Sequence, residues 1–111
     1  MTEITNEYMQ EMMTKTKNYT TVILKTGPNF NMDGARNIIW EHGRNNFRLR
    51  AEGKLSIVCP IPTTAGTCGL GIFNCSEEET RKLMEEDPAI KENVLLFEVY
   101  NCRSFPGDSL P

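Results

Sequence analysis

Apolar and polar residues alternate along this chain in a way that predicts strands and helices in a definite order. Short stretches rich in β-branched and aromatic residues, each ended by Gly, Pro or Asn, are typical of strands. They predict strands over residues 19–25, 54–59, 67–75 and 94–100. Between them, apolar residues recur at spacings of three and four over 34–52, and again after Ser76, which predicts two helices.

The helix boundaries also carry recognisable signals. Asp33 is the expected N-cap of the first helix, and Gly53 is the expected stop at its end. Ser76 and Glu79 match a capping box for the second helix, which should run to about residue 86. Asp87 and Pro88 should then begin a short turn before the last strand.

The resulting order, strand-helix-strand-strand-helix-strand, predicts an α+β protein of the split βαβ, ferredoxin-like type. Such a chain forms a four-stranded antiparallel sheet with two helices on one face. Val22 and Leu24 alternate with Ile23, and Leu55 and Ile57 alternate with Val58, so the strands carry apolar residues on both faces. In so small a chain a second subunit is the natural cover, and we therefore expect a homodimer.

Length and charge narrow the class of protein. The 111 residues favour one domain over residues 18–111, with residues 1–17 as an extension that forms either a short helix or a loose arm. The net charge of −3 and the absence of a basic patch argue against a nucleic-acid partner. The chain has no apolar run of about 20 residues and no basic start followed by an apolar stretch, so we expect a cytoplasmic protein with no membrane partner.

The four cysteines have spacings that no common metal site uses. No C-x-x-C pair occurs, and the only histidine lies far from the cysteines in sequence. We expect reduced thiols, no metal ion and no cofactor, since no glycine-rich nucleotide-binding loop follows the first strand either. Cys59 is expected to be a buried thiol rather than a nucleophile, because nothing cationic is predicted beside it.

The one histidine, His42, is the strongest candidate for chemistry. It lies on the apolar stripe of the first predicted helix and is the only side chain here that ordinarily titrates near neutral pH. A packed, hydrogen-bonded core histidine would give the same pattern, so both interpretations stay open. The neighbouring Gly43 lowers the stability of the predicted helix by about 1 kcal/mol relative to Ala. It either allows another backbone to approach closely or is a weakness that the helix tolerates. The stripe consists of Ala35, Ile38, Ile39, His42, Asn46 and Leu49.

With these elements in order, the chain resembles the YCII-related family over residues 19 to about 106. No single motif is diagnostic, and the resemblance depends on the joint order and spacing of several short ones. It departs from the family at Cys59, where glycine is usual, and in its longer N-terminal arm. The matching residues are His42, then Gly53-Lys54-Leu55, Cys59-Pro60, Gly71-Ile72-Phe73, Ser76 to Glu79, and Asp87-Pro88.

The resemblance implies a dimeric α/β barrel that binds a small molecule and holds a His–Asp pair in a cleft. Carried over, the candidate catalytic residues are His42 and Asp87, with the carboxylate orienting the imidazole. This implies a cofactor-independent acid–base enzyme of the lyase or isomerase type. The alternative is a non-catalytic homodimeric ligand-binding or interaction module, and the sequence does not decide whether the protein is an enzyme.

Three further features have structural explanations beside their functional ones. Asp87 precedes a proline, which is also the ordinary pattern of a helix or turn cap. The loop from Thr63 to Thr67 could line the mouth of a cleft, or simply form a turn. Trp40 and Phe47 are expected to be core or dimer contacts rather than a platform for a cofactor.

Overall fold

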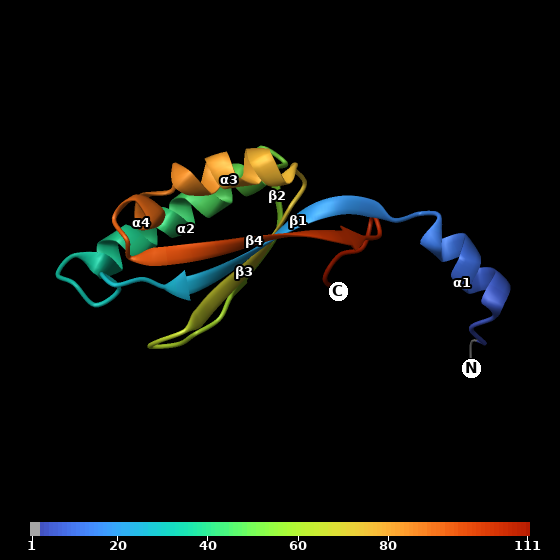
Figure 1. The fold of residues 1–111 in the computed structure, drawn as a ribbon, viewed down its shortest axis with the longest axis horizontal. Helices are drawn as coiled ribbons and strands as arrows, with labels where there is room; N and C mark the ends of the chain where they lie inside the picture. Colours follow the sequence, from blue (N-terminus) through green and yellow to red (C-terminus); the bar gives the residue numbers. More distant parts are fainter. Residues whose placement is uncertain (1–2) are drawn as a thin grey trace.

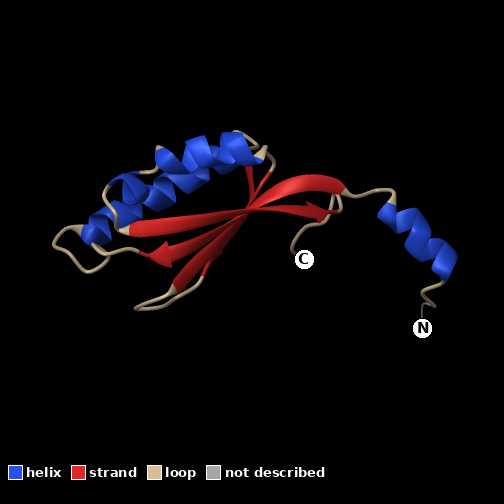
Figure 2. Cartoon of the chain, in the orientation of Figure 1, coloured by secondary structure: helices blue, strands red, loops and turns tan. Residues whose placement is uncertain are grey.

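The computed structural model describes residues 3–111, in which helices cover one face of a four-stranded antiparallel sheet (Figures 1 and 2). The predicted α+β class and antiparallel sheet are confirmed. The strand order is β2-β3-β1-β4, so β1 and β3 form the centre of the sheet. The strands are β1 (Lys17–Thr26), β2 (Leu55–Pro60), β3 (Thr67–Phe73) and β4 (Leu95–Ser104). The helices are α1 (Asn6–Met13), α2 (Ala35–Ala51), α3 (Glu77–Glu85) and α4 (Pro88–Lys91).

Strands β1 and β4 are longer than the apolar pattern predicts. They pair without interruption from Lys17 opposite Ser104 to Thr26 opposite Leu95. The ladder of backbone hydrogen bonds continues past the apolar residues, because it needs no particular side chain. Strand β3 is shorter than predicted and ends at Phe73, whereas β2 includes Pro60, which an edge strand tolerates.

The predicted N-cap of α2 is wrong, and its predicted stop is confirmed. Gly34, not Asp33, precedes the helix, with a φ of 82° and no side-chain cap. The first N–H of the helix, that of Ala35, does not need a side-chain cap, because it donates to the Met32 carbonyl in the preceding turn. At the other end Gly53 has a φ of 77°, and Lys54 N–H donates to the Leu49 carbonyl, which closes the helix.

The chain between β3 and β4 contains two helices where one helix and a turn are predicted. Ser76 caps α3 as expected, since its hydroxyl accepts the Glu79 N–H at 3.1 Å. Asp87 caps α4, a single turn that starts at Pro88. The predicted turn is therefore a short helix, because proline fits the first helical position and Asp87 supplies the cap.

The core lies between the helices and one face of the sheet. The inward stripe of α2 is confirmed, with Ala35, His42 and Leu49 buried. Val22 and Phe73 face these helices from the sheet. The alternating residues of the strands point to the opposite face, which no described helix covers (Figure 2). That face carries Ile23, Leu70, Ile72, Leu96 and Tyr100.

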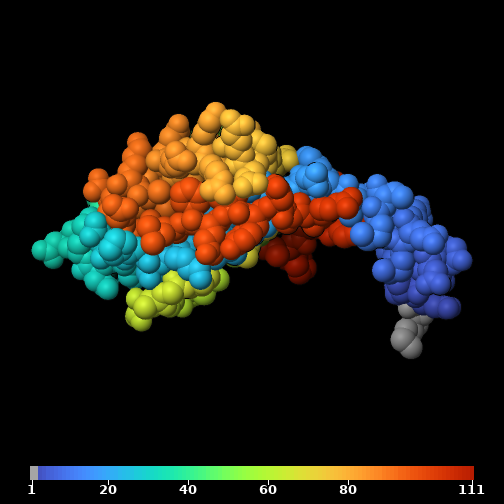
Figure 3. Space-filling model, in the orientation of Figure 1, coloured from blue at the N-terminus to red at the C-terminus, as the bar shows by residue number. Residues whose placement is uncertain are grey.

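The N-terminal extension forms a helical arm that stands away from the rest of the chain (Figure 3). Its helix α1 is capped by Thr5, and none of its residues is buried. The predicted short helix is thus present, while residues 1–2 of the predicted extension lie outside the described residues. Within residues 3–111 no helix is both long enough and apolar enough to cross a membrane.

Candidate functional site

Helix α2 holds His42 over the sheet with its imidazole almost fully buried. The side chain lies midway along the helix, and the residue is 8% exposed. Its Nδ1 is 2.8 Å from Oδ2 of Asp87, which is 45 positions further along the chain. The two residues that the sequence singles out are therefore in direct contact.

Asp87 uses both carboxylate oxygens and is 1% exposed. Its Oδ1 accepts the Ala89 N–H at 2.9 Å, which caps α4. Its Oδ2 accepts hydrogen bonds from His42 Nδ1 and, at 3.0 Å, from Asn45 Nδ2. The two roles that the sequence leaves open, helix cap and imidazole partner, are both present, one on each oxygen.

These contacts keep the carboxyl group of Asp87 ionised. Burial, the largest effect, raises its pKa, since a charge is less stable away from water. The hydrogen bond and charge of His42 oppose burial, as do the hydrogen bonds from Asn45 and Ala89. Together they outweigh it and lower the pKa of Asp87 below its ordinary value.

An ionised carboxylate can only accept hydrogen bonds, so the His42 Nδ1 carries the hydrogen. The other ring nitrogen, Nε2, lies 3.2 Å from Asn46 Nδ2, an amide nitrogen that can only donate. The neutral imidazole with its hydrogen on Nδ1 satisfies both contacts. The geometry thus leaves Nε2 as the basic atom of the ring.

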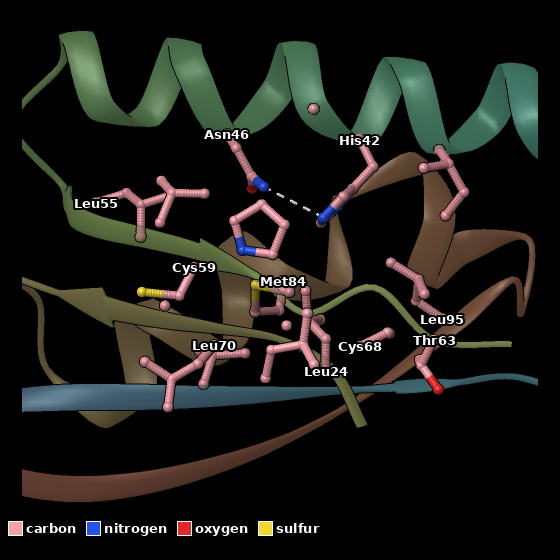
Figure 4. Close-up of a pocket in the computed structure, with 18 of the residues that line it drawn as sticks. Leu24, His42, Asn46, Leu55, Cys59, Thr63, Cys68, Leu70, Met84 and Leu95 are labelled. Atoms are coloured by element: carbon pink, nitrogen blue, oxygen red, sulfur yellow. Dashed lines mark hydrogen bonds between the residues drawn. The ribbon is translucent and has the colours of Figure 1, made fainter. Parts of the chain in front are cut away.

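A cavity of about 360 Å³ separates α2 from the sheet, and His42 lines it (Figure 4). Figure 4 shows His42 and Asn46 directed from α2 toward the strands, where Leu24 lies. Asp87 is not among the lining residues. It therefore lies behind the imidazole, and the expectation that both members of the pair face one cleft holds only for His42.

Two glycines of β3 help to leave this cavity open. Gly69 and Gly71 both line it, so neither contributes a side chain to the space. A Cβ on Gly69 would lie 3.2 Å from Leu24 Cδ1, and one on Gly71 would lie 3.2 Å from Leu55 Cδ1. Larger residues at either position would crowd Leu24 or Leu55, which also line the cavity.

Thr63, Cys59 and Cys68 also line the cavity. The sequence leaves two interpretations open for the loop of Thr63, a cleft mouth or a simple turn, and Thr63 does line the cavity. Burial raises the pKa of the Cys68 thiol, which disfavours the reactive thiolate. Within residues 3–111 no group of three or more His, Cys, Asp and Glu side chains is placed to hold a metal ion.

The sequence interpretation missed the two asparagines of the site. Asn45 and Asn46 follow His42 by three and four positions, which is the spacing that brings side chains together on a helix. Asn46 lies on the predicted apolar stripe, and a second polar residue beside His42 on such a stripe is a signal for a polar site. The core interpretation of Trp40 and Phe47 is wrong, because they are 69% and 64% exposed.

The fold and the site define a small α+β protein with a buried His–Asp pair beside an apolar cavity. No known protein-family model matches the chain, and no curated protein is significantly similar to it.

Proposed function

We propose that this protein binds a small, largely apolar molecule in the cavity beside His42 and acts on it as an acid–base catalyst. The reaction would be a cofactor-independent proton transfer of the lyase or isomerase type. One observation carries the proposal: His42 lines an apolar cavity and its Nδ1 is held by a buried carboxylate.

The division of labour within the pair follows from its geometry. Asp87 acts as a positioning residue, since it fixes the tautomer and orientation of the imidazole without lining the cavity. Nε2 of His42 takes a proton from the bound molecule, and the resulting imidazolium is stabilised by the negative charge of Asp87. The proton can then be returned to another atom of the same molecule or to a leaving group.

The lining of the cavity limits what can bind there. None of its residues is Lys, Arg, Asp or Glu. A phosphate or a sulfate would be buried without a neighbouring cation, at a large desolvation cost. Neutral molecules that carry one or two polar groups fit these surroundings best.

A general-base probe tests the proposal. The probe 5-nitrobenzisoxazole is a flat, neutral molecule that opens when a base removes its ring C–H proton. The proton passes to Nε2 of His42, the C–H electrons form the nitrile, the N–O bond breaks, and the opened molecule is a coloured cyanonitrophenolate. We expect turnover by the wild type and its loss in His42→Gln, with the fold of the variant checked by circular dichroism. Equal rates in both proteins would refute a basic His42.

Asp87→Asn should slow the same reaction by about 10- to 100-fold, as expected for the loss of a group that assists proton transfer. Glu85→Gln, an equal change of charge at an exposed residue of α3 outside the cavity lining, serves as the matched control and should leave the rate unchanged.

We further propose that the chain is a homodimer of the dimeric α/β barrel type, with a ferredoxin-like fold and a YCII-like relationship. The strand order β2-β3-β1-β4 and the uncovered apolar sheet face support the fold and the dimer. The contact between His42 and Asp87 supports the relationship, which no family model supports. A cytoplasmic location remains part of this proposal.

The alternative, a non-catalytic homodimeric ligand-binding or interaction module, has its own support. Trp40 and Phe47 are large, exposed aromatic residues seven positions apart on α2, as on many interaction surfaces. Binding of ligands beside His42 without any turnover of the probe would favour this alternative.

A further inference from the structure

The polar groups at the cavity wall are few, and two of them are already joined. Asn46 donates from Nδ2 to His42 Nε2 over 3.2 Å, as the dashed line in Figure 4 marks. Within residues 3–111 Oδ1 of Asn46 receives no hydrogen bond. Nε2 and the Asn46 amide thus form an acceptor and a donor side by side at the edge of an apolar space.

We propose that Asn46 is a specificity-determining residue that makes this cavity select a neutral hydroxyl group on an otherwise apolar molecule. The inference rests on the proposed function, since it concerns the ligand of the same cavity. The hydroxyl O–H donates to His42 Nε2, and its oxygen accepts the N–H of Asn46. One hydrogen bond within the protein is thereby replaced by two bonds to the ligand.

Other classes of ligand form fewer favourable contacts with His42 Nε2 and Asn46 Nδ2. A hydrocarbon leaves the bond between Asn46 and His42 in place and gains only apolar contacts with residues such as Leu24 and Leu95. A carboxylate offers no donor to Nε2 and would be buried where no cation lines the wall. A hydroxyl group both donates and accepts, so it matches the pair without a net charge.

The volume of the cavity also suits an apolar molecule that carries one hydroxyl group. An apolar cavity of about 150 Å³ is enough to bind benzene. The cavity beside His42, at about 360 Å³, has room for one substituted ring.

Three probes of similar shape test the inference: benzyl alcohol, toluene and benzoate. Their affinities for the full chain are measured by NMR titration at neutral pH, following the imidazole of His42 and the methyl groups around the cavity. We expect benzyl alcohol to bind about tenfold more tightly than toluene, as one additional hydrogen bond allows, and benzoate to bind most weakly.

The deciding variant is Asn46→Leu, which keeps a side chain of similar size but removes the amide. The informative comparison is with indole, a neutral ring compound that donates a hydrogen bond but accepts none. In the wild type indole only exchanges the Asn46–His42 bond for its own, so benzyl alcohol should bind about tenfold more tightly than indole. In Asn46→Leu both probes form one bond to Nε2, so this preference over indole should disappear. Asn37→Leu is the matched control, because Asn37 is an exposed residue of the same helix outside the cavity lining. It should leave all four affinities unchanged.

The outcomes separate this inference from the proposed function. Equal binding of benzyl alcohol and toluene by the wild type would overturn the role of Asn46 and leave the cavity as a ligand site. A preference for benzyl alcohol over indole that survives in Asn46→Leu would overturn it as well. Failure of all four probes to bind would refute the ligand-binding proposal and this inference together.

Discussion

At the scale of single residues, the carboxylate of Asp87 connects the site to the fold. Its two oxygens accept hydrogen bonds from the Ala89 backbone, His42 and Asn45 in a buried position. An amide cannot replace it, because an amide has one oxygen and one donor group. In Asp87→Asn either the cap of α4 or the contacts with the two side chains must be lost.

We therefore expect Asp87→Asn to lower the free energy of unfolding by about 2 to 3 kcal/mol near neutral pH. Urea denaturation of both proteins measures the difference, and Glu85→Gln, an exposed change of the same kind on α3, should cost much less. A loss below about 0.5 kcal/mol, the ordinary size of a surface substitution, would mean that the buried contacts contribute little.

The same carboxyl group predicts a pH dependence. Its pKa is lower in the folded protein than in the unfolded chain, so the unfolded chain binds more protons in acid. The stabilisation is present above about pH 4 and is lost as the pH falls through the lowered pKa. The difference in stability between wild type and Asp87→Asn should thus shrink from about pH 6 to about pH 3; a constant difference would contradict the lowered pKa.

At the scale of secondary-structure elements, the glycines of the chain have opposite roles. A Cβ on Gly43 of α2 would meet no atom within 4 Å, so the suggested close backbone approach is wrong and a tolerated weakness remains. A Cβ on Gly27, at the end of β1, would lie 2.3 Å from the Asn93 carbonyl oxygen. Gly27 therefore lets the chain after β1 pass close to the turn before β4.

Gly43→Ala and Gly27→Ala test this contrast as a matched pair. We expect Gly43→Ala to stabilise the protein by about 1 kcal/mol, because alanine is the better helix former. We expect Gly27→Ala to destabilise it by more than about 2 kcal/mol, because backbone atoms would have to move. Chemical denaturation followed by circular dichroism measures both, and equal effects of the two substitutions would contradict this explanation.

At the scale of the whole molecule, the sheet face opposite the helices exposes apolar side chains that a partner would shield from water. Leu96 and Tyr100 of that face are 45% and 53% exposed. Covering these side chains with a second copy would remove a large apolar area from water, at roughly 25 cal/mol per Å². The face is therefore the expected site of the homodimer.

We expect light scattering to give twice the chain mass of 12.6 kDa at micromolar concentration. Ile72→Lys in the centre of the face should give a monomer, because it would bury an unpaired charge in the interface. Trp40→Lys on the outer side of α2 is the control and should stay dimeric. A monomeric wild type would refute the dimer. If Trp40→Lys were monomeric and Ile72→Lys were not, the interface would lie on α2 and not on the sheet face.

The thiols provide a prediction for the molecule as a whole. The four cysteines are expected to be reduced, because their sequence spacing suits neither a metal site nor a secreted disulfide framework. Titration of the denatured protein, isolated without reductant, should find four free thiols. Fewer thiols, or one zinc ion per chain by elemental analysis, would contradict this.

The sequence by itself determined the order of the elements and the direction in which many side chains point. Spacings of three and four place His42 on the buried side of α2, and period-two alternation places apolar residues such as Ile23 opposite the helices. The capping of α3 by Ser76 is equally local. These features depend on residues only a few positions apart, so the repeat of each backbone conformation determines them.

Only the tertiary structure decided how the site is assembled. The 2.8 Å contact between His42 and Asp87 joins residues on two different helices, and the resemblance at both positions could suggest the pair but not its distance. The cavity depends on which face of β3 receives Gly69 and Gly71, and the replacement of Asp33 by Gly34 as N-cap depends on a preceding turn. The physical reason is the same in each case, because packing and strand register set distances between residues that no local pattern relates.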